Sequence, residues 1–213
     1  MAEETRTVHL VDDDESIRRS VSFMLRTSGY LVKTYASGVE FLAEVKSAAP
    51  GCILLDVLMP EVDGLEVQRR LRAQGIFLPV IVMTAHGDVN VSVQAMKGGA
   101  IDFIEKPFDK AVLIGALEDG FDRLEQSARR HARAEEARAR LEVLTSREMD
   151  VMKGLVRGHP NKTIAYDLGI SPRTIEIHRA NLMTKLGVTS LSEALRTAFA
   201  AGLGDEEDGE QRG

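Results

Sequence analysis

Five short apolar runs alternate with five longer amphipathic segments over residues 1–125. Short apolar runs between polar turn residues predict strands buried on both faces, and strict alternation with helices predicts a doubly wound α/β domain. In the flavodoxin-like order of such a five-stranded parallel sheet, the ligand crevice falls between the first and third strands. The expected strands are Val8–Val11, Leu31–Thr34, Cys52–Leu55, Val80–Met83 and Asp102–Ile104. The expected helices are Glu15–Ser28, Gly38–Ala48, Leu65–Gln74, Asn90–Gly98 and Lys110–Leu124.

Two of these strands end in carboxylates. The first runs into Asp12, Asp13 and Asp14, and the third runs into Asp56. If the strands are neighbours, these side chains share one crevice, where they stay ionised only if a cation joins them. A hard divalent ion or a lysine would serve, so the sequence predicts an acidic metal site with a reactive aspartate.

Two later residues supply the remaining chemistry. Thr84 follows the fourth expected strand, and Lys106 follows the fifth. A nucleophilic aspartate, metal-binding carboxylates, a hydroxyl and a lysine are the parts that move a phosphoryl group. We expect Mg²⁺ to bridge Asp13, Asp56 and a phosphoryl oxygen, with Asp12 reached mainly through water.

Composition and charge bound the rest. With 44% hydrophobic and 28% charged residues, the chain is typical of a folded protein, and no apolar stretch approaches the ~20 residues that span a bilayer. The N-terminus has no apolar signal-like region, and Cys52, the single cysteine, is expected to be a buried small side chain; both suit a cytoplasmic location. Residues 1–125 hold 13 Lys and Arg against 20 Asp and Glu, whereas residues 141–203 hold 8 against 6. This difference predicts two modules, of which the second tolerates an anionic partner.

Residues 126–140 and 204–213 lie outside both modules. The first segment is rich in Ala, Arg and Glu and predicts a helical linker, either simply solvated or acting as a weak dimerising helix. The second segment is acidic and is expected to be disordered.

The second module, residues 141–203, is wholly helical in pattern, with four short helices. Asn161–Leu168 and Ser171–Leu186, joined by a tight turn at Gly169, outline a helix-turn-helix in which Ile175, Leu182 and Leu186 face the core. The expected boundary signals are the capping box Thr145-x-x-Glu148, a cap at Asn161, Ser171-Pro172, the stop at Gly187 and Ser190-x-x-Glu193.

The first module resembles the receiver domain of bacterial two-component response regulators, which accept phosphate from a sensor histidine kinase onto an aspartate. The resemblance implies that Asp56 is the phosphoacceptor, that the backbone carbonyl of Leu58 joins Asp12, Asp13 and Asp56 around Mg²⁺, and that the bond before Pro107 is cis. Thr84 and Lys106 would engage the phosphoryl group, and Phe103 would turn inward with Thr84. The matching residues are Asp12-Asp13, Asp56, Met59-Pro60, Asp63-Gly64, Thr84-Ala85, Gly99-Ala100 and Lys106-Pro107-Phe108.

The lifetime of such a phosphoryl group depends on access of water. Leu58 and His86 lie two residues beyond Asp56 and Thr84, where side chains can help or block an attacking water. Leu58 cannot orient water, so Leu58→Asn is expected to change the dephosphorylation rate, whereas His86 is a weaker candidate.

The second module resembles the LuxR-type DNA-binding domain, and the whole chain a FixJ-type response regulator. The resemblance implies a base-reading face that contains Arg173, Thr174, Glu176, Ile177 and Arg179, phosphate contacts from Lys162 and Lys185, and a scaffold or DNA role for His178. The modest charge of this module predicts weak binding as a monomer and dimerisation onto paired half-sites. The matching residues are Leu144-Thr145-x-Arg147-Glu148, Gly158, Asn161-Lys162-x-Ile164-Ala165, Ile170-Ser171-x-Arg173-Thr174-Ile175, His178 and Lys185-Leu186-Gly187-Val188.

Together these features predict a cytoplasmic transcription factor, not an enzyme beyond its own Mg²⁺-dependent phosphorylation and dephosphorylation. Its expected partners are a sensor histidine kinase, promoter DNA, a second copy of itself once phosphorylated, and RNA polymerase. Three alternatives stay open: a receiver that acts by protein contacts alone, a DNA binder indifferent to phosphate, and a haloacid-dehalogenase-like enzyme. The last requires an aspartate two residues after the nucleophile, where this chain has Leu58.

Overall fold

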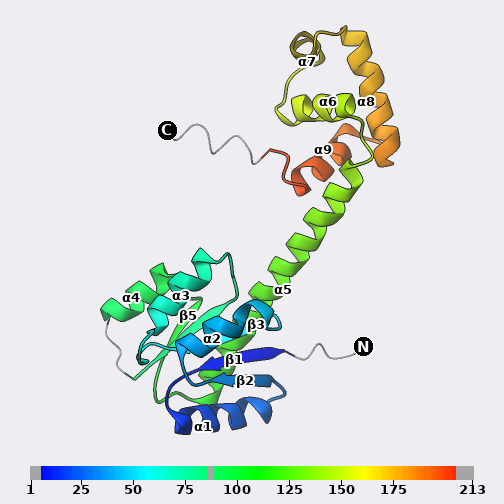
Figure 1. Ribbon diagram of the computed structural model, residues 1–213. Coiled ribbons are helices and arrows are strands. Elements are labelled where there is room, and N and C mark those ends of the chain that lie inside the picture. The colour runs from blue at the N-terminus through cyan, green and yellow to red at the C-terminus, as the bar shows by residue number, and fades with distance from the viewer. Residues whose placement is uncertain (1–5, 86–88, 205–213) are drawn as a thin grey trace. The chain divides into compact units, whose positions relative to one another are not determined.

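The computed structural model describes residues 6–85 and 89–204, which fall into two compact units, residues 1–127 and 128–213. The first unit contains a five-stranded parallel sheet in the order β2-β1-β3-β4-β5, which confirms the flavodoxin-like fold (Figure 1). Its strands are β1 (Thr7–Val11), β2 (Leu31–Tyr35), β3 (Gly51–Asp56), β4 (Val80–Thr84) and β5 (Asp102–Glu105). Its helices are α1 (Glu15–Arg26), α2 (Gly38–Glu44) with a 3₁₀ turn (Val45–Ser47), α3 (Gly64–Ala73), α4 (Val89–Lys97) and the start of α5 (Lys110–Leu141).

The inner strands β1, β3 and β4 are buried on both faces because they are largely apolar at successive positions, whereas the edge strands β2 and β5 are partly exposed, contrary to the prediction. Alternate residues of β3 contribute to different clusters: Ile53 and Leu55 pack with α2, α3 and α4, whereas Cys52 and Leu54 pack with α1 and α5. All six residues of β3 are buried. The central strand is therefore held rigidly, and so is the carboxylate at its end.

The second unit is all-helical and surrounds its own core. Its helices are α6 (Ser146–Val156), α7 (Asn161–Leu168), α8 (Pro172–Leu186) and α9 (Leu191–Ala200), and the final turns of α5 add Ala137 and Leu141 to the same cluster. Helix α5 thus runs without interruption through the predicted linker, residues 126–140, most of which are exposed. In the described part of the chain, no helix is long and apolar enough to cross a membrane.

The predicted helix boundaries of this unit are largely confirmed. Thr145 and Glu148 form the capping box, Ser171 caps α8, and Gly169 ends α7 in the left-handed conformation at φ 66°. The predicted cap at Asn161 is wrong: Pro160 is the N-cap of α7 and Asn161 is already helical. The tail beyond Gly204 lies outside the described residues.

Candidate functional site

Strand register brings the predicted acidic and phosphoryl-binding residues to one edge of the sheet. Val11 pairs with Leu55, so the residues that follow, Asp12 and Asp56, leave adjacent strands side by side. Thr84 pairs with Glu105 at the ends of β4 and β5. Lys106 directly follows Glu105, so it lies beside Thr84 at the same edge of the sheet. The first and third strands are therefore neighbours, as the predicted site requires.

Lys106 joins the two buried carboxylates directly. Its Nζ donates to Asp12 Oδ2 at 2.6 Å and to Asp56 Oδ1 at 2.8 Å. Asp12 is 1% exposed and Asp56 is 6% exposed, so both ion pairs lie in a largely dry environment. The peptide bond between Lys106 and Pro107 is cis.

The carboxylates fit a divalent cation. One oxygen from each of Asp12, Asp13 and Asp56 lies within 4.8 Å of the others, and Asp13 is exposed at the mouth. Three hard oxygen donors on a partly open site match the preference of Mg²⁺, which keeps several waters. Leu58 lies at the rim with its side chain 62% exposed. The metal role of its carbonyl and the effect of Leu58→Asn stay predictions.

Electrostatics leave this site short of positive charge. Burial raises the pKa of the Asp56 carboxyl, and the neighbouring charges of Asp12 and Asp13 raise it further, whereas Lys106 opposes both effects. Burial lowers the pKa of the Lys106 ammonium, but its hydrogen bonds to Asp12 and Asp56 outweigh that effect and the pKa is raised. One ammonium thus faces three carboxylates, and an added cation would relieve their repulsion.

The three consecutive aspartates have two different roles: Asp12 and Asp13 belong to the acidic cluster, whereas Asp14 caps a helix. Asp14 caps α1 by accepting from the backbone N–H of Ser16 at 2.7 Å, while its own N–H donates to Asp12 Oδ1 at 2.9 Å. Arg18, which sequence reasoning missed, donates from Nη1 to the backbone carbonyl of Asp12 at 2.7 Å. An arginine four residues after the cap was the available signal, because that spacing returns a side chain to the start of the helix.

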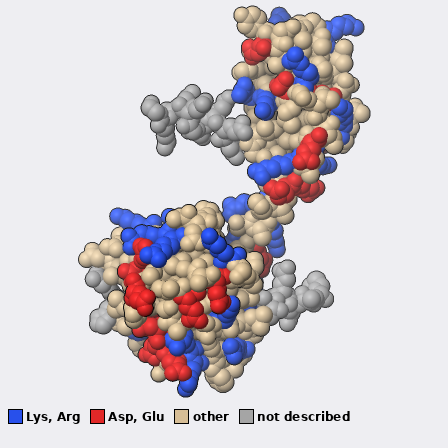
Figure 2. Space-filling view, in the orientation of Figure 1, with Lys and Arg blue, Asp and Glu red and all other residues tan. Residues whose placement is uncertain are grey.

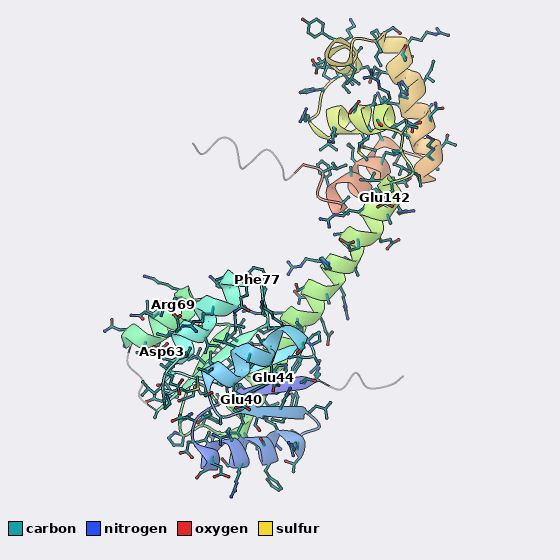
Figure 3. All side chains as sticks on the ribbon, viewed as in Figure 1. Glu40, Glu44, Asp63, Arg69, Phe77 and Glu142 are labelled. Atoms are coloured by element: carbon teal, nitrogen blue, oxygen red, sulfur yellow. The ribbon has the colours of Figure 1, made fainter. Side chains whose placement is uncertain are left out.

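Gly64 permits a close approach behind the acceptor strand. A Cβ at this position would collide with the carbonyl oxygen of Asp56, and its N–H donates to the carbonyl of Val57 at 2.9 Å. The preceding Asp63 caps α3 by accepting from the N–H of Glu66 (Figure 3). The Asp63-Gly64 pair therefore sets how the chain turns away from Asp56.

The expected switch residues Thr84 and Phe103 lie on the neighbouring strands β4 and β5. Thr84 is 2% exposed at the end of β4, and Phe103 is half-buried against the cluster beneath α3 and α4. Their switch role, together with that of Pro107, stays a prediction. His86 lies outside the described residues.

In the second unit, α8 has the predicted buried and exposed faces. Ile175, Leu182 and Leu186 are buried in the core, as expected. The exposed surface includes Arg173, Glu176 and Ile177 of α8 and Lys162 of α7, while Thr174 and His178 are half-buried. Basic side chains lie among acidic ones on the visible face of this unit (Figure 2).

Two predicted DNA-contacting cations are held by partners within the unit. Arg179 donates from Nη1 to Asn161 Oδ1 at 2.7 Å, which ties α8 to the start of α7. Lys185 Nζ lies 2.7 Å from Oε2 of Glu148, a carboxylate that also accepts from the Thr145 backbone and hydroxyl. Neither bond excludes a DNA contact, and the proposed roles of both residues stay predictions.

Two family models match the chain. The model of the response regulator receiver domain matches residues 8–118, and that of the bacterial regulatory proteins of the luxR family matches residues 142–198. These matches cover most of the two folded units. The class defined by fold and site is therefore a response regulator with a DNA-binding output domain.

Relatives and solved structures narrow this class. The chain is 46% identical to the transcriptional regulatory protein FixJ of Azorhizobium caulinodans, with 96% of this chain and 97% of the relative covered, and 46% identical to FixJ of Rhizobium meliloti, with 93% and 97% covered. The solved response regulator StyR matches with a TM-score of 0.74 at 36% identity, over 92% of this chain and 98% of StyR. Full-length FixJ from B. japonicum matches with a TM-score of 0.59 at 42% identity, over 93% and 98%. The chain belongs to the FixJ-type family of two-component transcriptional regulators.

Proposed function

We propose that this regulator is switched by phosphorylation of Asp56. The observation that carries the proposal is a buried carboxylate at the end of β3 whose Oδ1 lies 2.8 Å from Lys106 Nζ, next to two further carboxylates. In the reaction, an Asp56 oxygen forms a bond to the phosphorus of a kinase phosphohistidine. The phosphorus–nitrogen bond breaks, and its electron pair stays on the imidazole.

The surrounding residues prepare this transfer. Asp12, Asp13, Asp56 and the Leu58 carbonyl would hold Mg²⁺, which supplies charge neutralisation for the phosphoryl oxygens. Lys106 is already oriented by two ion pairs and would shift toward the new charge. Thr84, buried at the neighbouring strand end, would donate its hydroxyl to the phosphoryl group.

The output follows from a change of surface on α4 and α5. Phe103 turns inward as Thr84 engages the phosphoryl group, and two copies then pair through this surface. Exposed apolar side chains support such pairing: Val89 is 73% exposed, Val93 44%, Met96 49% and Val112 53%. The new contacts can shift the equilibrium only by their differential affinity for the two states, so the resting and active states must be close in free energy.

DNA is read by the exposed face of α8. In the paired form, two recognition helices reach two half-sites, and the contacts come from Lys162, Arg173, Thr174, Glu176, Ile177, Arg179 and Lys185. We further propose a cytoplasmic location, a sensor histidine kinase as phosphodonor and RNA polymerase as the downstream partner. We also propose that the receiver module ends at residue 125, the linker at residue 140 and the DNA-binding module at residue 203.

The test measures binding to promoter DNA with and without acetyl phosphate and Mg²⁺. Phosphate-stimulated binding is expected for the native chain and for Glu44→Gln, a control that neutralises an exposed carboxylate at the end of α2. Asp56→Asn is expected to take up no phosphoryl group and to show no stimulation. Stable phosphorylation without DNA binding would instead favour action by protein contacts, and equal binding by Asp56→Asn and the phosphorylated chain would refute the switch.

A further inference from the structure

A cavity of about 230 Å³ lies in the first unit at the end of the sheet opposite Asp56. Pro79 and Val80, at the start of β4, form part of its wall, whereas the phosphorylation site lies at the carboxyl ends of the strands. Apolar side chains contributed by α3, by the α3–β4 loop and by α5 line a further part of it. They include Leu71, Phe77 and Leu124, and Phe77 lies beyond the end of α3 (Figure 3).

A buried amide faces this cavity without a complete set of hydrogen bonds. Gln68 is 3% exposed, and its Nε2 donates to the carbonyl of Ala95 at 3.4 Å. Its Oε1 has no hydrogen-bond partner among the described residues. Buried acceptors are nearly always satisfied by protein, water or ligand. Gly98 lies directly beside this oxygen, and a Cβ there would lie 3.0 Å from Oε1, closer than an ordinary van der Waals contact.

Two guanidinium groups also line the cavity. Arg72 lies directly over Gly99, where any side chain would displace it, and Arg123 approaches from α5. Within residues 6–85 and 89–204, neither arginine forms an ion pair. Planar guanidinium groups without a carboxylate partner are suited to bidentate recognition of a bound anion.

We propose that this cavity binds a small carboxylic acid that has an apolar body and one hydrogen-bond donor. Arg72 and Arg123 hold the carboxylate, the apolar wall covers the body, and Gln68 Oε1 accepts from the donor. The cavity is smaller than the ~300–1,000 Å³ of sites for drug-sized ligands, which limits the ligand to a single ring or a short chain. The excess of acidic residues in this unit disfavours a dianion such as phosphate.

The experiment titrates the full-length, ¹⁵N-labelled chain with 4-hydroxybenzoate. Saturable shifts are expected at the amides of Gly98 and Gly99 and at the Gln68 side chain, with Kd on the order of 1 mM for so small a ligand. Benzoate, which lacks the donor, is expected to bind several-fold more weakly. No shift at these groups up to about 20 mM would overturn the proposal.

Variants separate a built site from general surface attraction. Arg72→Ala combined with Arg123→Ala is expected to weaken binding at least tenfold, whereas Arg69→Ala, an α3 arginine paired with Glu66 outside the cavity, leaves it unchanged. Gln68→Leu is expected to remove the preference for 4-hydroxybenzoate over benzoate. Equal weakening by Arg69→Ala, or equally tight binding of inorganic phosphate at these residues, would overturn the proposal. Uptake of phosphoryl groups by Asp56 is measured separately, so the two proposals fail independently.

Discussion

Two lysine–carboxylate sites, one in each unit, have similar pair geometry and different charge balance. Lys106 Nζ lies 2.6 Å from Asp12 Oδ2 and 2.8 Å from Asp56 Oδ1, while Lys185 Nζ lies 2.7 Å from Glu148 Oε2. All three carboxylates are nearly inaccessible to solvent. Distance and burial therefore do not distinguish a reactive site from a structural one.

The distinction lies in how many donors serve each carboxylate. In the first unit, one ammonium serves two buried carboxylates beside a third, and the pKa of Asp56 is raised by burial and by its acidic neighbours. In the second unit, Glu148 alone receives an ammonium, a hydroxyl and a backbone N–H. Burial raises the pKa of Glu148, but the hydrogen bonds from Lys185 and Thr145 outweigh it and the pKa is lowered. Surplus negative charge distinguishes the proposed phosphorylation site, whereas Glu148 has its hydrogen bonds fully satisfied and has a structural role.

Removal of the lysine should have the largest effect in the first unit. Lys106→Met leaves three carboxylates without a fixed cation, and we expect it to lower the free energy of unfolding of this unit by about 3 kcal/mol in EDTA. Mg²⁺ should restore most of this loss, because the cation no longer competes with the ammonium. Hydrogen exchange of the buried amides in β3, with and without Mg²⁺, measures both effects.

The charge-balance argument fails if Lys106→Met is as stable as the native chain in EDTA, or if Mg²⁺ stabilises the native chain more than the variant. Arg19→Met, in which an exposed i,i+4 pair with Glu15 is removed, is the matched control. It should be neutral, because exposed pairs contribute little.

The equivalent lysine-to-methionine substitution in the second unit should lower the free energy of unfolding by a smaller amount. Lys185→Met leaves Glu148 buried but still bound to the Thr145 N–H and hydroxyl. We therefore expect the free energy of unfolding of the second unit to fall by about 1–2 kcal/mol. Mg²⁺ should not restore it, since a single carboxylate is a poor ligand set. Exchange of buried α6 and α8 amides reports the loss, and rescue by Mg²⁺ would show that the two sites do not differ in kind.

Replacing Asp56 or Glu148 by its neutral amide should change the free energy of unfolding in opposite directions in the two units. Asp56→Asn relieves repulsion and should stabilise the first unit by about 1 kcal/mol without Mg²⁺. Glu148→Gln weakens a saturated network and should destabilise the second unit by about 1 kcal/mol. Exchange of β3 and α8 amides in the two variants checks the signs, and effects of the same sign would contradict the assignment.

Much of the first site follows from sequence because each of its residues ends or directly follows a parallel strand. Parallel strands bring their carboxyl ends to one edge, so Asp12, Asp56, Thr84 and Lys106 could be assembled from apolar runs alone. The charge state could not, because it depends on burial and on the position of Nζ between two carboxylates. Arg18 was missed because its guanidinium contacts a backbone carbonyl, so its position four residues after the capping Asp14 was the only signal of this contact in the sequence.

The second site was not predicted as a site at all. Thr145 and Glu148 were expected to form a local capping box, and they do. Lys185, however, lies 37 residues further along the chain, and only the packing of α8 against α6 brings it to Glu148. Asn161 shows the same limit: its pattern predicted a cap, but tertiary structure gives its oxygen to Arg179. Sequence patterns predict hydrogen bonds between residues a few positions apart, whereas partners distant in the sequence can be identified only from the folded structure.

The pH dependence of the second unit gives the smallest expected effect and tests saturation directly. Because hydrogen bonds lower the pKa of Glu148 below its ordinary value of 4.5, the folded unit binds its proton less readily than the unfolded chain. The stabilising contribution is therefore complete above the ordinary value and is lost as the pH falls through the folded-state pKa. The stability difference between the native chain and Glu148→Gln should accordingly shrink from neutral to acidic pH, as measured by urea unfolding followed at α8 amides. A difference that grows under acid would mean that burial raises the pKa of Glu148 as it does that of Asp56, and a constant difference would mean that folding does not shift this pKa; either result would remove the contrast between the two sites.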